Sequence, residues 1–186
     1  QTGAAYIFFG GANMNNVADV TLSGVATTDL FGGYVASAGD LNADGFKDVI
    51  VGARQNDAAG TNAGCAYVFY GGTVVNNVPD ATFTGYNAND QFGYTVANAG
   101  DVNRDGYTDL LIGTPLNDEA GADAGKVWLF TNTRNYNISP IATFSGPGGF
   151  DYFALKSSNC GDLNGDGYDD VMATSINYER VYIFFG

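Results

Sequence analysis

The 186-residue chain contains no histidine, two cysteines, four prolines and seven basic residues. The absence of histidine excludes Ser-His and Cys-His catalytic pairs and most zinc sites, because imidazole is the usual general base and the commonest metal ligand. Two cysteines are too few for a disulfide framework. No apolar run approaches the roughly 18 residues of a membrane-spanning helix. Twenty acidic residues give a net charge of −13, so we expect no nucleic-acid partner and no membrane insertion.

The residues that are abundant favour an all-β fold. The chain has 27 glycines and 14% aromatic residues, whereas Leu, Glu and Lys are few. This composition is typical of many short strands joined by glycine-rich turns. The chain starts at Gln1 without a basic-then-apolar leader, which we interpret as the sign of a processed chain or of a fragment.

An internal repeat of 61 residues organises the chain. The acidic segment 40–48 recurs at 101–109 and at 162–170, and each copy reads D-x-N-x-D-G-x-x-D; we name these segments loops 1, 2 and 3. Because the repeats fill the chain, we expect a single repeat domain, 1–186, without a separate linker. Its parts are N-terminal strands at 1–23, repeat 1 at 24–84, repeat 2 at 85–145 and a truncated repeat 3 at 146–186.

Each repeat predicts four short strands. First strands are expected at 32–39, 93–100 and 154–161, second strands at 48–52, 109–113 and 170–173, third strands at 66–70, 127–130 and 181–185, and fourth strands at 80–84 and 141–145. The segment 6–10 (YIFFG) duplicates 182–186 and adds another third strand, and 19–23 adds a fourth strand. Third strands that are apolar on both faces require packing on both sides, as in stacked propeller blades. The sequence therefore predicts three four-stranded β-propeller-type blades, which form an incomplete propeller by themselves.

The acidic loops carry the candidate metal chemistry. Positions one, three, five and nine offer hard oxygen donors, glycine at position six allows a sharp turn, and a backbone carbonyl at position seven adds a fifth donor. Oxygen-only donors favour Ca²⁺ over transition metals. Strand-like flanks and an acid at position nine disfavour an EF-hand, and three copies in one phase argue against simple turn formation. We expect three Ca²⁺ per chain, held by Asp40, Asn42, Asp44, Phe46 and Asp48 in loop 1, by Asp101, Asn103, Asp105, Tyr107 and Asp109 in loop 2, and by Asp162, Asn164, Asp166, Tyr168 and Asp170 in loop 3.

Three features together resemble the FG-GAP repeat. They are a Phe-Gly pair before the first strand (31–32 and 92–93), the acidic loop, and a Gly-Ala-Pro-like end of the second strand (52–54 and 113–115). That repeat builds the β-propeller head of integrin α subunits and occurs in many bacterial extracellular proteins. The resemblance implies four-stranded blades with Ca²⁺ between their first and second strands. Repeat 3 departs from the pattern with Phe153-Ala154, with Ala-Thr-Ser at 173–175 and with a loop shortened by seven residues, although its candidate ligands are intact.

The number of blades leaves the assembly open. The resemblance implies propellers that usually close with about seven blades, and three blades cannot close a ring. The chain is a fragment of a longer propeller, or copies form a ring in which residues 19–23 complete another copy's last blade, or head-to-tail contacts continue into a fibre. We favour self-assembly, because open blade faces and unpaired strand edges are a liability that association relieves.

These observations favour a non-enzymatic function. Nine of the twenty acids are candidate calcium ligands in the loops, and the remainder show no convergent pair of the kind that glycoside hydrolysis uses. We expect a calcium-stabilised extracellular or cell-surface structural or adhesion protein that assembles with itself; the alternative is a propeller module that binds a protein or glycan ligand. Calcium sites of extracellular modules, with dissociation constants of about 10⁻⁴–10⁻³ M, fill outside cells.

Asn137 begins a glycosylation sequon, and Cys65 and Cys160 lie two blades apart, too far for a disulfide.

Overall fold

A computed structural model of the chain describes residues 2–12, 14–131 and 139–186, so that Asn137 of the sequon lies outside the described residues. Within them the chain forms thirteen strands in four antiparallel sheets. The N-terminal sheet contains β1 (Ala4–Ile7) and β2 (Val20–Ser23). Blade 1 contains β3 (Phe31–Gly39), β4 (Asp48–Ala53), β5 (Cys65–Phe69) and β6 (Ala81–Thr84); blade 2 contains β7 (Thr95–Gly100), β8 (Asp109–Thr114), β9 (Lys126–Phe130) and β10 (Ala142–Ser145); blade 3 contains β11 (Ser157–Gly161), β12 (Asp170–Ser175) and β13 (Arg180–Phe184).

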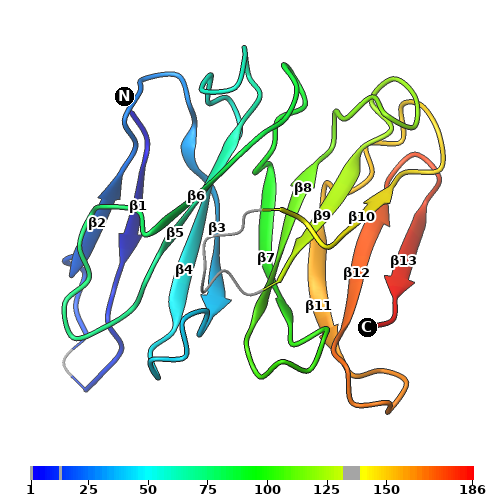
Figure 1. The fold of residues 1–186 in the computed structure, drawn as a ribbon. Coiled ribbons are helices and arrows are strands. Elements are labelled where there is room, and N and C mark those ends of the chain that lie inside the picture. Colours follow the sequence, from blue (N-terminus) through cyan, green and yellow to red (C-terminus); the bar gives the residue numbers. More distant parts are fainter. Residues whose placement is uncertain (1, 13, 132–138) are drawn as a thin grey trace.

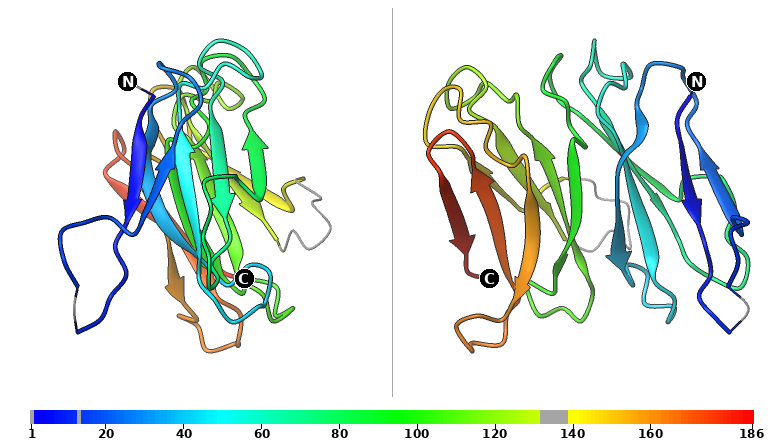
Figure 2. Two further views of the ribbon diagram at one scale, coloured as in Figure 1. Left: turned by 90° about the vertical axis from the view of Figure 1, so that its left-hand side faces the viewer. Right: turned by 180° about the vertical axis from the view of Figure 1, so that it is seen from behind.

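The four sheets stand face to face in chain order, from the N-terminal sheet to blade 3, and do not close into a ring (Figures 1 and 2). In blades 1 and 2 each strand pairs with its neighbours in sequence, from first to fourth. The expected all-β, propeller-type fold is therefore confirmed. The described residues include no helix of the length and apolar character that crossing a bilayer requires.

Some strands begin at other positions than the sequence predicts. β7 begins two residues later and β11 three residues later than expected, and β1 lies nearer the N-terminus than 6–10. The cause at β7 and β11 is a contact with the preceding blade: Phe92 forms an isolated parallel bridge with Gly64, and Phe153 forms one with Gly125. These phenylalanines thus connect neighbouring blades and lie outside the first strands of their own blades.

Close approach between blades explains the glycines of the Phe-Gly and Gly-Ala-Pro segments. A Cβ atom on Gly52 would lie 2.0 Å from the carbonyl oxygen of Gly93 in the next blade, and a Cβ atom on Gly93 would lie 2.2 Å from the carbonyl oxygen of Cys65. Only glycine leaves room for these backbones. In repeat 3, Ala154 takes the place of the second glycine of this contact and adopts a φ of 69°, a conformation that favours glycine.

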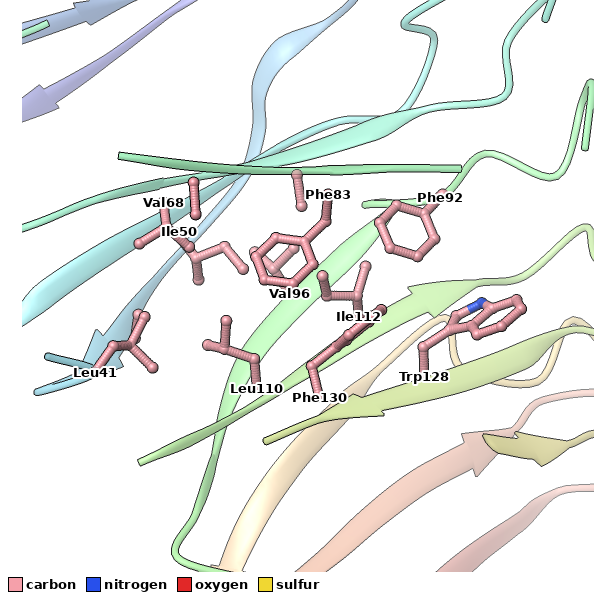
Figure 3. Packing of buried hydrophobic residues seen from close by; sticks show 13 residues of the cluster. Leu41, Ile50, Val68, Phe83, Phe92, Val96, Leu110, Ile112, Trp128 and Phe130 are labelled. Carbon is pink, nitrogen blue, oxygen red and sulfur yellow. The ribbon is translucent and has the colours of Figure 1, made fainter. Parts of the chain in front are cut away.

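The core consists of layers between adjacent sheets. The layer between blades 1 and 2 combines Ile50, Val68 and Phe83 with Ile112 and Phe130 (Figure 3). The rings of Phe83 and Phe130 lie 4.8 Å apart at 63°, an edge-to-face arrangement that adds to the gain from burial. Similar layers separate the N-terminal sheet from blade 1 and blade 2 from blade 3. Both cysteines are free, in agreement with the expectation of no internal disulfide.

This stacking places the three acidic loops together. Each loop joins the first strand of its blade to the second, and all three lie at the lower end of the blades in Figure 1. The blade-to-blade contacts therefore bring segments 61 residues apart onto one edge of the molecule.

Candidate metal-binding loops

The backbone of each acidic loop contains two residues with positive φ. Position six is glycine, with a φ of 93° at Gly45, 87° at Gly106 and 91° at Gly167. Position four is also left-handed, at Ala43 with a φ of 55° and at Arg104 with a φ of 57°. The sharp turn that the sequence predicted at position six is confirmed, whereas the second left-handed residue, at position four, was missed because alanine and arginine do not signal it.

The side chains at positions one, three and five organise the loop around their oxygen atoms. In loop 1 the two carboxylate oxygens of Asp40 accept the backbone N–H groups of Asp44 (3.1 Å) and Gly45 (3.0 Å). Asn42 Oδ1 accepts the same Asp44 N–H at 3.0 Å, and Asp44 Oδ1 accepts the N–H of Phe46 at 2.9 Å. Loops 2 and 3 repeat these bonds within 0.2 Å. Four of the five candidate positions, namely one, three, five and seven, are thus folded alike in the three copies of the loop.

Position nine lies behind the loop as a buried carboxylate. Asp48 is 1% exposed, and its two oxygens accept the N–H groups of Leu41 at 2.7 Å and Gly71 at 2.8 Å. Burial raises the pKa of Asp48, the two N–H donors oppose this, and the negative charges of Asp44 and Asp40 raise it further. The counterparts Asp109 and Asp170 are buried too. Each position-nine carboxylate therefore joins its loop to the body of the blade.

The donor chemistry of the loops fits a hard cation. All side-chain donors are oxygen atoms, and the ion pair that the structure shows among the described residues, between Lys126 and Glu119, lies outside the loops. The arrangement is not convergent, however, since in the same described part no three acidic, histidine or cysteine side chains are grouped closely enough to hold a metal ion. The carboxylate oxygens of the loop accept backbone N–H groups, and each oxygen keeps a further lone pair.

Loops 2 and 3 also contact each other across the blade interface. The N–H of Asp101 donates to Asp169 Oδ2 at 2.8 Å, and the N–H of Asp169 donates to the carbonyl oxygen of Asp101 at 3.2 Å. Arg104 extends in the other direction, with its guanidinium 3.4 Å from the carbonyl oxygen of Asp166 and 5.2 Å from the ring centre of Tyr168.

The repeated sequence pattern does not point to Arg104 or Asp169. Both lie at variable loop positions: position four is Ala43 in loop 1, and position eight is Lys47 in loop 1 and Thr108 in loop 2. The backbone N–H of Tyr168, the amide of Asn164 and the charge of Arg104 together hold the pKa of Asp166 below its usual range. The signal in the sequence was a positive charge at position four of loop 2 and a negative charge at position eight of loop 3, which the other loops lack.

Comparison with known proteins agrees with this architecture. The family profile described as FG-GAP repeat matches residues 32–69 and 92–130, which span the first three strands and the acidic loops of blades 1 and 2. Integrin alpha-5 of Xenopus laevis is 30% identical over 164 residues, which cover 83% of this chain and 15% of the relative. Integrin alpha-6 of Homo sapiens is 34% identical over 155 residues, which cover 82% of this chain and 13% of the relative.

The chain therefore corresponds to a small part of these relatives, about a seventh of their length. Integrin alpha subunits are cell-surface proteins that face the extracellular space, and the expected location agrees with this. Strand order, the glycine contacts between blades and the matched profile lead to one identification. The chain contains FG-GAP repeats in two of its propeller-like blades, and over most of its length it is similar to a segment of integrin alpha subunits.

Proposed function

We propose that this chain is a calcium-stabilised module of FG-GAP blades in an extracellular or cell-surface adhesion or structural protein, and that it works without catalysing a reaction. The observation that carries the proposal is the identical folding of three oxygen-rich loops at one edge of the blades. Integrin alpha subunits are adhesion receptors and not enzymes, which supports the non-catalytic part.

Calcium would act here by relieving repulsion and by closing the loops. In loop 1 the ion would be held by the side chains of Asp40, Asn42, Asp44 and Asp48 and by the carbonyl of Phe46, and loops 2 and 3 would use their equivalents. Three Ca²⁺ would offset six of the thirteen net negative charges. An ion that binds the native state alone stabilises it by mass action. Dissociation constants of about 10⁻⁴–10⁻³ M are expected.

Thermal unfolding of the full chain tests this proposal. We expect a markedly higher melting temperature with millimolar calcium than with excess chelator, and calorimetric titration should give three bound ions. The substitution Asp44→Ala should reduce this number to two. Glu179→Gln removes the charge of an exposed acid outside the loops and should leave three. An unchanged melt in chelator, together with no metal by elemental analysis, refutes calcium binding.

Self-association is a further part of the proposal, carried by the exposed face of β13. Val181 and Ile183 are 60% and 48% exposed, whereas their repeat counterparts include Val68 at 1% and Leu129 at 5%, which the following blade covers. We propose that a further blade, from a longer chain or from a second copy, covers this face. In a second copy, residues 19–23 would also pair as a strand with the edge of β13. The 186-residue chain should then sediment as a dimer or larger species at micromolar concentration with calcium, and Ile183→Asp should weaken this. Sedimentation as a monomer excludes self-association.

A ligand-binding role is the second candidate. A groove of about 600 Å³ runs along the first strands and is lined by residues that include Tyr34, Val96, Ser158 and Met172. Grooves with apolar walls and few polar groups are the usual sites of ligand binding. The immobilised chain should then retain a peptide or glycan from a screening library, and Ser158→Trp, which fills the groove, should abolish that binding. Retention that is unaffected by the tryptophan would place the ligand elsewhere.

A further inference from the structure

Equivalent contacts join loop 1 to blade 2 and loop 2 to blade 3, and they differ in charge. The glycine before loop 1, Gly39, lies directly against the side chain of Thr108, and the glycine before loop 2, Gly100, lies directly against the carboxylate of Asp169. Thr108 and Asp169 both occupy position eight of the following loop. Loop 2 therefore receives a negative charge from its neighbour, whereas loop 1 receives a neutral side chain.

The residue at position four contributes a charge of the opposite sign. Ala43 of loop 1 has no side chain that reaches the next loop, but Arg104 of loop 2 extends to loop 3. Its guanidinium lies over the ring of Tyr168 and directly beside the Cα of Gly167, and it donates to the carbonyl oxygen of Asp166. A fixed positive charge thus lies against three consecutive residues of loop 3.

We propose that Arg104 and Asp169 set different calcium affinities for the two loops, so that loop 2 binds calcium more tightly than loop 3. This inference rests on the proposed function, in which both loops bind Ca²⁺. A divalent cation is attracted by the additional carboxylate at the Asp101 N–H and repelled by the guanidinium beside Asp166. The Arg104 contact is exposed and the Asp169 contact is only partly buried, so both are partly screened by solvent, and each accounts for roughly a threefold to tenfold change in affinity.

The residues at position seven allow the two loops to be observed separately. Tyrosine sensitises the luminescence of Tb³⁺, a hard cation of similar preference for oxygen ligands, and loop 1 has Phe46 where loops 2 and 3 have tyrosine. In the full chain, Tyr168→Phe leaves Tyr107 as the reporter of loop 2, and Tyr107→Phe leaves Tyr168 as the reporter of loop 3. Displacement of Tb³⁺ by calcium then gives the calcium affinity of each loop.

Three charge substitutions are compared in both reporter chains. In the unsubstituted background we expect loop 2 to bind calcium at least about threefold more tightly than loop 3. Arg104→Gln should raise the calcium affinity of loop 3 roughly threefold to tenfold, and Asp169→Asn should lower the calcium affinity of loop 2 by a similar factor. Lys156→Gln is the matched control, because this lysine lies near Tyr34 before β11, at the end of that strand opposite to loop 3. It should change neither loop by more than about twofold.

The outcomes separate this inference from the proposed function. Equal or reversed affinities of the two loops, or an Arg104→Gln effect that is the same in both, would overturn the inference while calcium binding stands. No displacement of Tb³⁺ by calcium in either reporter chain would overturn both.

Discussion

Asp48 and Asp40 lie in the same loop but should affect stability in different ways. The structure places Asp48 in the interior, where its carboxylate accepts the buried N–H of Leu41 and the partly buried N–H of Gly71. Asp48→Ala leaves both donors without a partner. A buried donor without a partner costs about 1–3 kcal/mol. Part of this cost is offset, because the variant no longer has to bury the charge of the carboxylate. We expect the free energy of unfolding in chelator to fall by about 2–3 kcal/mol.

Asp40→Ala removes hydrogen bonds of the same number from the exposed side of the loop. Water can replace the carboxylate at the N–H groups of Asp44 and Gly45, which are exposed, so the loss in chelator should be about 0.5–1 kcal/mol. With about 10 mM calcium and the expected affinities, both variants should additionally lose roughly 1.4–2.7 kcal/mol of ion-linked stability.

Urea unfolding followed by circular dichroism measures the loss in free energy of unfolding for both variants, once with excess chelator and once with calcium. The slope of the free energy against urea concentration should be the same for all chains, since a change in slope would indicate an altered unfolded or native state. If Asp48→Ala and Asp40→Ala are equally mild in chelator, the buried linking role of Asp48 is refuted. If calcium stabilises both variants as much as the unsubstituted chain, neither side chain binds the ion.

Three further predictions follow from the backbone and from burial. Gly52→Ala should destabilise the chain by about 2–3 kcal/mol in urea unfolding, because the added methyl meets the carbonyl of Gly93 in the next blade; a neutral effect would show that the blades separate easily. Ala43→Gly should stabilise it by about 1 kcal/mol in the same assay, because glycine relieves the left-handed φ of 55°; a loss of stability would contradict the strain. Burial raises the pKa of the Cys65 thiol, and Cys160 is less buried, so a thiol reagent should label Cys160 first and Cys65 only with unfolding. Equal labelling rates in the folded chain would argue against the buried position of Cys65.

Much of the fold was predictable because the same sequence unit is repeated along the chain. The 61-residue period, the four apolar segments of each complete unit and the duplicated YIFFG predicted the short strands, the two complete blades and the truncated last blade. Local chemistry also predicted which residues would shape the acidic loops, since glycine at position six and Asp or Asn at positions one, three and five form such turns by themselves. Calcium binding stays a prediction.

Strand starts were less predictable, because they depend on contacts between repeats. The segment around Phe92 has the composition of a strand, but the bridge to Gly64 in the previous blade holds it away from its own sheet. The residue pattern within one repeat contains no information on which neighbouring backbone competes for its hydrogen bonds.

The sequence by itself thus determined the repeated unit, its strands and the oxygen-rich loops, since these follow from local periodicity and turn chemistry. Only the tertiary structure decided how the loops influence one another. Asp101 and Asp169 are 68 residues apart, and Arg104 and Asp166 are 62 apart, and both pairs meet because blade 3 packs on blade 2. The physical reason is that stacking of the blades sets the distance between loops, and the distance between charges sets the strength of their interaction.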